Sequence, residues 1–269
     1  TVTGPKTAVG YQDFTAGANN TATKQVTVTP GNPVTLNNLP YGTYTVTEAN
    51  QVGEIVNGKY YFVSKTDSAT VDLGTDKDLA DDTATITNTY APYRTVTITK
   101  DVGGNMGVTD YPFNFTTKVN GTDIDSTTVN TDGILEIDGR KIEISFTGDE
   151  ETATLTKEGY TLADGDTITI TKLKDGDVIT LKETDGNSNG YTTVYKISET
   201  ELSKDNDGNA TYKVAGDANI IVTNERNVGT PTGFFEDNLP FTLMISAAGL
   251  AGIALIATIL VRRQRRRRE

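Results

Sequence analysis

Most of this chain alternates residue by residue between aliphatic or aromatic side chains and polar ones, chiefly threonine. Because successive side chains of a β-strand point to opposite faces of a sheet, this period of two predicts strands and not helices. Pro-Gly and Asp-Gly turn signals separate the alternating segments and keep each of them short. The plainest segments are residues 25–29, 43–47, 95–99, 167–171 and 219–223. The sequence therefore predicts an all-β fold.

An internal repeat divides the polar part of the chain in two. The segment at residues 36–48 is similar in sequence to residues 170–183, and both end in glutamate. The segment at 84–88 is likewise similar to 220–224, and both end in Thr-Asn. Short strands at this spacing are typical of immunoglobulin-like sandwiches. We therefore expect two tandem Ig-like β-sandwich domains, at residues 1–91 and 92–227, followed by a different C-terminal part at 228–269.

The composition excludes several kinds of chemistry. The chain has no Cys and no His, which removes disulfides, Cys/His zinc sites and Ser-His-Asp triads. Its net charge is −12 although the last eight residues are strongly basic, so the body is acidic and is expected not to bind nucleic acid. Residues 185–190 begin like a calcium loop, but Lys196 stands at the twelfth position where a glutamate ligand is needed. We expect no metal site, no cofactor and no independent enzyme activity.

The C-terminal part predicts one membrane-spanning helix. Residues 239–261 carry no charge and are long enough to cross a bilayer as a helix. The arginines that follow, from Arg262 to Arg268, mark the cytoplasmic side by the positive-inside rule. The rest of the chain is therefore expected outside the cell.

Just before this span stands Pro231-Thr232-Gly233. The order of Pro-Thr-Gly, an apolar span and an arginine cluster resembles the sorting signals that sortases process in Gram-positive bacteria. The resemblance implies cleavage between Thr232 and Gly233, and transfer of Thr232 to an amine on a peptidoglycan precursor or on a pilin lysine. A Leu-Pro-x-Thr string begins at Leu239, but it lacks the glycine that follows in the familiar signal and lies at the start of the span. The chain is thus expected to be a secreted cell-wall protein with a membrane-spanning precursor, in a mature or partial form.

A second resemblance comes from the body of the chain. The string Leu-Pro-Tyr-Gly-Thr-Tyr-Thr-Val-Thr-Glu at residues 39–48 resembles the B-type repeat domains of Gram-positive surface proteins and pilins. Thr-Ile-Thr-Lys100 and Val-Thr-Asn224 are similar to the opening and the close of the isopeptide-forming domains of that group. In that family a first-strand lysine and a last-strand asparagine condense into a side-chain amide with help from an acidic residue. The resemblance implies Lys100, Glu183 and Asn224 for these roles.

The alternation supports this assignment independently. Lys100, Glu183 and Asn224 each share a strand face with aliphatic residues, and are therefore expected to point into the core. Burying an ammonium, a carboxylate and an amide costs free energy unless they satisfy one another. The alternative is that the lysine and the glutamate reach past the strand ends to water.

The first domain offers an incomplete set. Glu48 and Asn88 occupy the positions that correspond to Glu183 and Asn224. Aligning residues 1–4 with 101–104 places the expected lysine one position before Thr1, outside this sequence. Lys24 is a weaker substitute, and Lys6, in an expected turn, is weaker still.

These features favour a structural, pilin-like surface subunit that sortase attaches through Thr232. The alternative is a wall-anchored adhesin that binds a host or matrix ligand. The usual Tyr-Pro-Lys-Asn pilin motif is absent, so the sequence does not identify a lysine that would accept another subunit.

Overall fold

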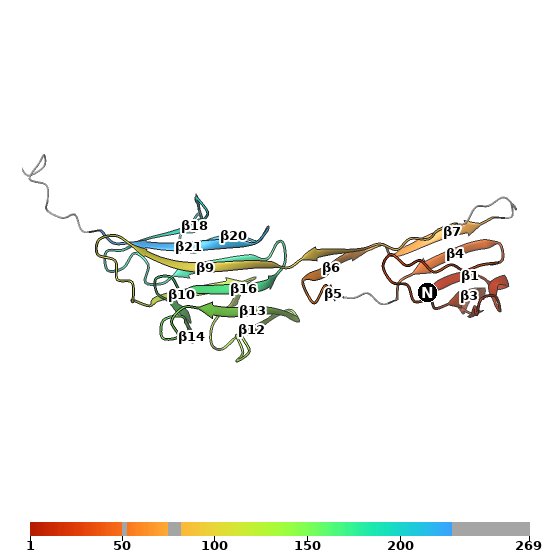
Figure 1. The fold of residues 1–269 in the computed structure, drawn as a ribbon, viewed down its shortest axis with the longest axis horizontal. Helices are drawn as coiled ribbons and strands as arrows, with labels where there is room; N and C mark the ends of the chain where they lie inside the picture. The colour runs from red at the N-terminus through yellow and green to blue at the C-terminus, as the bar shows by residue number, and fades with distance from the viewer. Residues whose placement is uncertain (50–52, 75–81, 228–269) are drawn as a thin grey trace, which may run out of the picture.

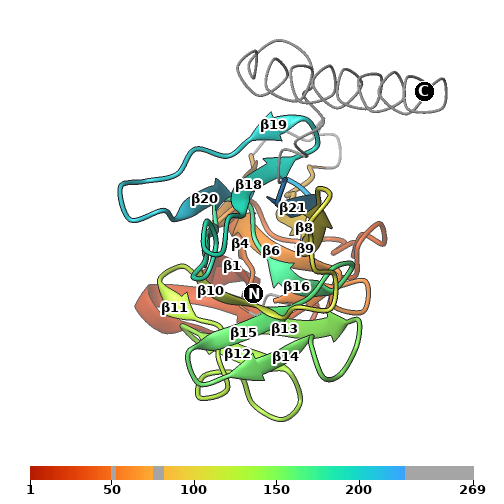
Figure 2. The ribbon, with the colours of Figure 1, turned by 90° about the vertical axis from the view of Figure 1, so that its left-hand side faces the viewer.

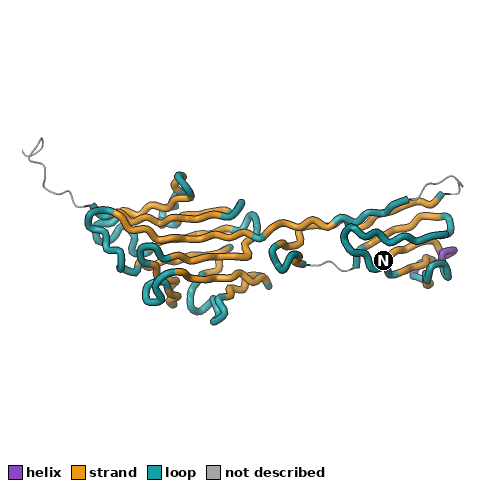
Figure 3. The backbone as a smooth tube through the Cα atoms, viewed as in Figure 1, coloured by secondary structure: helices purple, strands orange, loops and turns teal. Residues whose placement is uncertain are grey.

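The computed structural model describes residues 1–49, 53–74 and 82–227. The predicted cleavage site at Pro231, Thr232 and Gly233 and the apolar segment 239–261 lie outside the described residues. Within the described ranges, no helix is long and apolar enough to cross a bilayer. The helical segments of these ranges are two 3-10 turns, Lys6–Ala8 and Ala18–Asn20. Strands and loops make up the rest (Figure 3), so the all-β prediction is confirmed.

The two parts of the body lie end to end along the long axis of the molecule (Figure 1). Viewed down that axis, the first part lies behind the second (Figure 2). Strand β8 (Asn88–Pro92) ends the first part, and β9 (Arg94–Gly103) begins the second. Only Tyr93 separates these two strands, so the chain passes between the parts almost without a linker.

Two sheets form the second domain. The first sheet has the order β14-β15-β10-β17-β20, with β11 paired to β10. The second has the order β12-β13-β16-β9-β21-β18-β19. Its central strands β9 and β21 run parallel, and the other pairs of both sheets are antiparallel. The strands are β10 (Phe113–Val119), β11 (Thr122–Asp123), β12 (Ile134–Ile137), β13 (Arg140–Thr147), β14 (Thr154–Thr156), β15 (Gly159–Leu162), β16 (Thr167–Leu173), β17 (Val178–Glu183), β18 (Thr192–Ile197), β19 (Thr200–Glu201), β20 (Ala210–Lys213) and β21 (Ala218–Glu225).

One continuous hydrophobic core lies between these two sheets. Its buried side chains come from alternate positions of facing strands, including Ile98 of β9, Phe115 of β10, Leu181 of β17 and Val222 of β21. The alternation of apolar and polar residues in the sequence thus corresponds to an inward and an outward face on each strand. The second domain is a β-sandwich.

The first domain is built differently. Its larger sheet has the order β2-β3-β1-β4-β7, and a separate sheet has the order β5-β6-β8. The core cluster of this domain, centred on Phe14 and Tyr44, contains no described residue of β5, β6 or β8. The strands are β1 (Val2–Pro5), β2 (Thr15–Ala16), β3 (Thr21–Lys24), β4 (Gly42–Thr47), β5 (Glu54–Ile55), β6 (Tyr60–Lys65) and β7 (Ser68–Leu73), with β8 described above.

One expectation stays a prediction and another needs correction. Among the described residues, the two sheets of the first domain do not share a core cluster, so a second sandwich equivalent to that of the second domain stays a prediction. The alternating segment 25–29 is not a strand: β3 ends at Lys24, and Val28 is 58% exposed. Alternation alone is insufficient where no neighbouring strand supplies hydrogen bonds and a surface to pack against.

Lys172 joins the two domains. A bulge interrupts the pairing of β16 with β9, and Lys172 there has a left-handed φ of 63°. A bulge redirects the side chain that it carries, and here the Lys172 amine donates to the carbonyl oxygen of Gly58. The same amine lies 3.9 Å from the carboxylate of Glu54 and 4.7 Å from the centre of the Tyr93 ring. A Cβ at Gly58 would come within 2.7 Å of this amine, so glycine makes room for it.

Other contacts cross the same junction. The Tyr93 hydroxyl donates to Glu54 at 2.6 Å, and burial together with this carboxylate raises the pKa of Tyr93 to about 12. The Lys174 amine lies 4.6 Å from the centre of the Tyr61 ring. These contacts connect the small β5-β6-β8 sheet to the turn and bulge of the second domain, and together they oppose bending at Tyr93.

We predict that Lys172→Ala loosens this junction. It removes a hydrogen bond, a partly exposed ion pair and an amine–aromatic contact, together worth about 1 kcal/mol. The chain has no native cysteine, so one introduced cysteine in each domain can carry a spin label. The interdomain distance distribution should broaden in Lys172→Ala. It should be unchanged in the control Lys118→Ala, whose ion pair with Asp123 lies within the second domain. Equal distributions in both variants would contradict the role of Lys172.

Candidate functional site

Three strands bring Lys100, Glu183 and Asn224 together in the core of the second domain. Lys100 is on β9 and Asn224 on β21, and these strands are parallel neighbours in which Lys100 is level with Val222. Glu183 is the last residue of β17, in the opposite sheet. Each follows aliphatic residues at alternate positions, so the strand geometry directs all three side chains inward.

The three residues are almost fully buried. Lys100, Glu183 and Asn224 are 1%, 3% and 0% exposed. The side chains of Lys100 and Glu183 have no exposed surface, so they do not reach past the strand ends to water. Burial of this kind is uncommon for lysine and glutamate, which are mostly exposed unless paired.

The three side chains contact one another through Glu183. The Lys100 Nζ lies 3.5 Å from Glu183 Oε2, and Asn224 Nδ2 donates to Glu183 Oε1 at 2.5 Å. Lys100 Nζ also donates to the backbone oxygens of Val222 and Asp101, each at 3.1 Å. The glutamate therefore stands between the amine and the amide.

Aromatic side chains enclose this cluster. The Lys100 Nζ lies 4.5 Å from the centre of the Phe113 ring. Phe113 makes edge contacts with Tyr111 and Tyr191. On the other side, the backbone N–H of Glu183 donates to the Tyr195 hydroxyl at 2.8 Å. The rings exclude water from the amine and fix the end of β17.

Burial changes the acidity of both charged groups. Desolvation lowers the pKa of Lys100, although the Glu183 carboxylate partly offsets this. Desolvation likewise raises the pKa of Glu183, although Lys100 and Asn224 partly offset it. Both shifts favour the neutral forms, an amine and a carboxylic acid.

Two buried oxygens of the cluster remain without a hydrogen bond in the described structure: Glu183 Oε2 and Asn224 Oδ1. An unsatisfied buried polar atom costs about 1–3 kcal/mol. A proton on Glu183 together with rotation of the Asn224 amide by half a turn would let Oδ1 accept a hydrogen bond from the carboxylic acid. That state polarises the amide carbonyl beside a neutral amine, which is the arrangement for attack of an amine on an amide.

The first domain brings together only part of its predicted set. Asn88 Nδ2 donates to Glu48 Oε1 at 3.0 Å. Lys24 instead lies 3.5 Å from Asp13, and Lys6 is exposed in its 3-10 turn. Thr1 pairs with Thr47 beside Glu48, and a lysine before Thr1 stays a prediction.

Lys65 is a residue that the sequence did not single out. Its Nζ donates to the backbone oxygen of Glu48 at 3.2 Å, and Lys65 is the cross-strand partner of Asn88. The register of β6 against β8 brings this pair together, and neither segment alone predicts that register.

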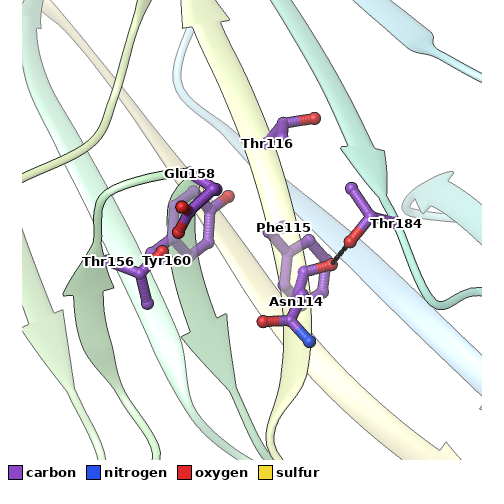
Figure 4. Close-up of a pocket in the computed structure, with 7 residues that line it drawn as sticks. All are labelled: Asn114, Phe115, Thr116, Thr156, Glu158, Tyr160 and Thr184. Atoms are coloured by element: carbon purple, nitrogen blue, oxygen red, sulfur yellow. Dashed lines mark hydrogen bonds between the residues drawn. The ribbon is translucent and has the colours of Figure 1, made fainter.

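None of the three cluster residues lines either of two surface hollows. The one in Figure 4 encloses about 300 Å³ and has a single charged side chain, Glu158, on its wall. The hydroxyl of Thr184 closes one side of it by donating to the backbone oxygen of Asn114 at 3.3 Å. Another hollow, of about 380 Å³, lies at the domain junction beside Lys172. Within the described ranges no group of three or more acidic side chains could hold a metal ion.

Comparisons with known families cover both domains. Residues 94–226 match a family described as a domain of unknown function, DUF7601. Residues 2–91 match another domain of unknown function, DUF5979. No curated protein matches the chain in sequence.

The structural neighbours come from the group that the sequence motifs resemble. The chain is 21% identical to the major pilin T3.2 of Streptococcus pyogenes, with a TM-score of 0.40, covering 68% of this chain and 66% of that one. Another major pilin of the same organism is 19% identical, with a TM-score of 0.37 and coverages of 72% and 73%. The pilus-presented adhesin Cpa is 18% identical, with a TM-score of 0.31, covering 50% of this chain and 28% of that one. The chain thus spans just under two thirds of the first pilin and about a quarter of the adhesin.

We predict that Phe113→Ala destabilises the second domain by about 3–5 kcal/mol, because it leaves a cavity beside the Lys100 amine. Phe113→Leu should cost less, since it retains most of the apolar volume. The exposed Met106 is a matched control, and Met106→Ala should change stability by no more than about 0.5 kcal/mol. Denaturant unfolding of each variant measures these values. A loss for Phe113→Ala no larger than that for Met106→Ala would show that the ring does not support the cluster.

Proposed function

We propose that this chain is a pilin-like structural subunit of a Gram-positive cell surface, strengthened by an amide bond between Lys100 and Asn224. The observation that carries the proposal is the almost fully buried Lys100–Glu183–Asn224 cluster, in which the amine and the amide each contact one oxygen of the same carboxyl group. The order of Pro-Thr-Gly, apolar span and arginines at the C-terminus supports the location.

The bond needs no partner outside the chain. The neutral Lys100 Nζ attacks Cγ of Asn224, so that a new N–C bond forms and the bond from Cγ to Nδ2 breaks. One proton passes from Nζ to the leaving nitrogen, and ammonia departs. Glu183 carries this proton, because it contacts both the amine and the amide.

Formation of the amide bond also removes the free-energy cost of burying two charged groups in the core. An ammonium and a carboxylate buried in an apolar sandwich are costly, and the product is a neutral amide beside a neutral carboxylic acid. The new bond closes a loop from the first to the last strand of the domain. By analogy with a disulfide across a loop of this length, it would stabilise the domain by roughly 5 kcal/mol.

The purified chain should therefore weigh one ammonia less than its sequence mass for this bond. Lys100→Ala, Asn224→Ala and Glu183→Ala should each restore that ammonia. A tryptic digest of the wild type should contain one linked peptide that joins Lys100 to Asn224. Intact mass and peptide mass spectrometry measure both results.

Lys118→Arg is the control, because Lys118 is a paired lysine on the surface of the same domain. Apart from the substitution itself, it should show the same loss of ammonia as the wild type. If the wild type contains Lys100 and Asn224 only in separate, unmodified peptides, the internal bond is excluded.

Attachment to the cell surface is the second part of the proposal. Sortase would cut between Thr232 and Gly233, and an amine on a peptidoglycan precursor or on another subunit would take the Thr232 carbonyl. These residues lie outside the described structure, and the proposal here rests on the sequence motif alone.

Co-expression with the cognate sortase should give a ladder of SDS-resistant species from the wild-type chain. Thr232→Ala should abolish the ladder, whereas Thr242→Ala, in the Leu-Pro-x-Thr string that begins at Leu239, should retain it. Attachment to peptidoglycan as a single species would contradict polymerisation and would favour the wall-anchored adhesin. A ladder that persists in Thr232→Ala would exclude this residue as the cleavage site.

A further inference from the structure

Three Asn-Gly pairs in the chain have nearly the same backbone conformation. They are Asn57-Gly58, Asn120-Gly121 and Asn189-Gly190. The asparagine φ angles are 54°, 50° and 52°, and the glycine φ angles are 74°, 86° and 81°. Two successive left-handed residues of this kind are typical of a tight type I′ turn. All three asparagines are also exposed, so the pairs differ mainly in what holds the asparagine side chain.

Two hydrogen bonds fix the side chain of Asn120. Its Nδ2 donates to Asp177 Oδ1, and its Oδ1 accepts from the backbone N–H of Val178, each at 2.8 Å. The side chains of Asn57 and Asn189 make no hydrogen bond within the described ranges. Asn57 and Asn120 are otherwise matched in local sequence, because each is the middle residue of Val-Asn-Gly. The amide of Asn57 is therefore free to rotate, whereas the amide of Asn120 is held.

An asparagine before glycine can cyclise when its side chain is free. The backbone nitrogen of the glycine attacks the asparagine Cγ, and glycine has no Cβ to obstruct this approach. Hydrogen bonds that hold the amide in another position must break first, which raises the activation barrier. The two bonds of Asn120 should protect it from this reaction, and Asn57 and Asn189 lack that protection.

A carboxylate lies beside the first of these glycines. A Cβ at Gly58 would come within 3.0 Å of Glu54 Oε2. At Gly121 and Gly190, no carboxylate of the described residues lies within 4 Å of the corresponding position. A carboxylate this close to Gly58 can take the proton of its backbone N–H, directly or through one water. Asn57 thus has both a free amide and a neighbouring base.

We propose that Asn57 is a site of slow self-modification, converted to aspartate and isoaspartate through a cyclic imide with Gly58, with Glu54 as the base. The Gly58 nitrogen bonds to Cγ of Asn57 and the bond from Cγ to Nδ2 breaks. Ammonia leaves with the proton that the Gly58 nitrogen gives up through Glu54.

Water is the only co-reactant that the second step needs. It hydrolyses the imide at one of its two carbonyl carbons. Opening at Cγ leaves aspartate in the normal chain. Opening at the backbone carbonyl leaves isoaspartate, in which the main chain runs through Cβ and Cγ.

Conversion to isoaspartate would change the junction between the two domains. The carbonyl oxygen of Gly58 accepts a hydrogen bond from the Lys172 amine, and this contact joins the loop between β5 and β6 to the bulge of β16. Isoaspartate at position 57 adds one carbon to the main chain directly before Gly58, and so displaces that carbonyl. The junction should therefore loosen as the molecule ages.

Peptide mass spectrometry of the aged chain tests the proposal. The purified wild type is incubated at neutral pH in water enriched in heavy oxygen, which distinguishes conversion during incubation from conversion during digestion. Asn57 should take up oxygen at least about tenfold faster than Asn120, and the rate at Asn189 should lie between them. In the chain unfolded by denaturant, Asn57 and Asn120 should convert at similar rates, because both stand in Val-Asn-Gly.

Two further measurements test the base and the consequence. Glu54→Gln keeps the size of the side chain but removes the base, and it should slow conversion of Asn57 several-fold while Asn189 in the same molecule is unchanged. Spin labels on the two domains should give a distance distribution that broadens with age in the wild type and in the control Asn189→Gln. The distribution should not broaden in Asn57→Gln, since glutamine cyclises far more slowly than asparagine.

Equal rates at Asn57 and Asn120 in the folded chain would refute the proposal, and so would a difference that persists in the unfolded chain. If Glu54→Gln leaves the rate at Asn57 unchanged, Glu54 is not the base. Unfolding of that variant would be visible as a faster rate at Asn120. Equal broadening in Asn57→Gln and the wild type would show that Asn57 does not control the junction.

Discussion

Desolvation of three polar side chains is the constraint on which the second domain depends. Lys100, Glu183 and Asn224 come from β9, β17 and β21, and each stands on the face that the strand buries. A slip of one residue in any of these strands would turn the polar group outward and move aliphatic residues out of the core. The same pairing that fills the core therefore fixes the distances among the amine, the carboxyl group and the amide.

Much of this site could be predicted from the sequence, because period two is a local property of each strand. The inward direction of Lys100 and Glu183 follows from the aliphatic residues two and four positions before them. The packing of Phe113 against Lys100 does not follow from any local pattern. It depends on how β9 and β10, in opposite sheets, face each other across the core.

The first domain shows where local patterns fail. Residues 25–29 alternate as clearly as any strand, but Val28 has no sheet to pack against and is exposed. Lys65 lies in a segment with the pattern of an ordinary strand, and only the register between β6 and β8 brings it beside Asn88. The left-handed backbone of Lys172 is likewise unmarked in the sequence, because non-glycine residues rarely adopt it. In all three cases the structure depends on strand pairing between segments that are distant in the sequence.

The single residue between β8 and β9 has a consequence for how the molecule responds to force. A polypeptide linker normally acts as a soft spring, since slack chain straightens before any folded part is strained. Here Tyr93 alone separates the two strands, so there is almost no slack to take up. Tension along the long axis would act directly on the backbone hydrogen bonds between paired strands. The molecule would then behave as a stiff rod whose length hardly changes until a strand detaches.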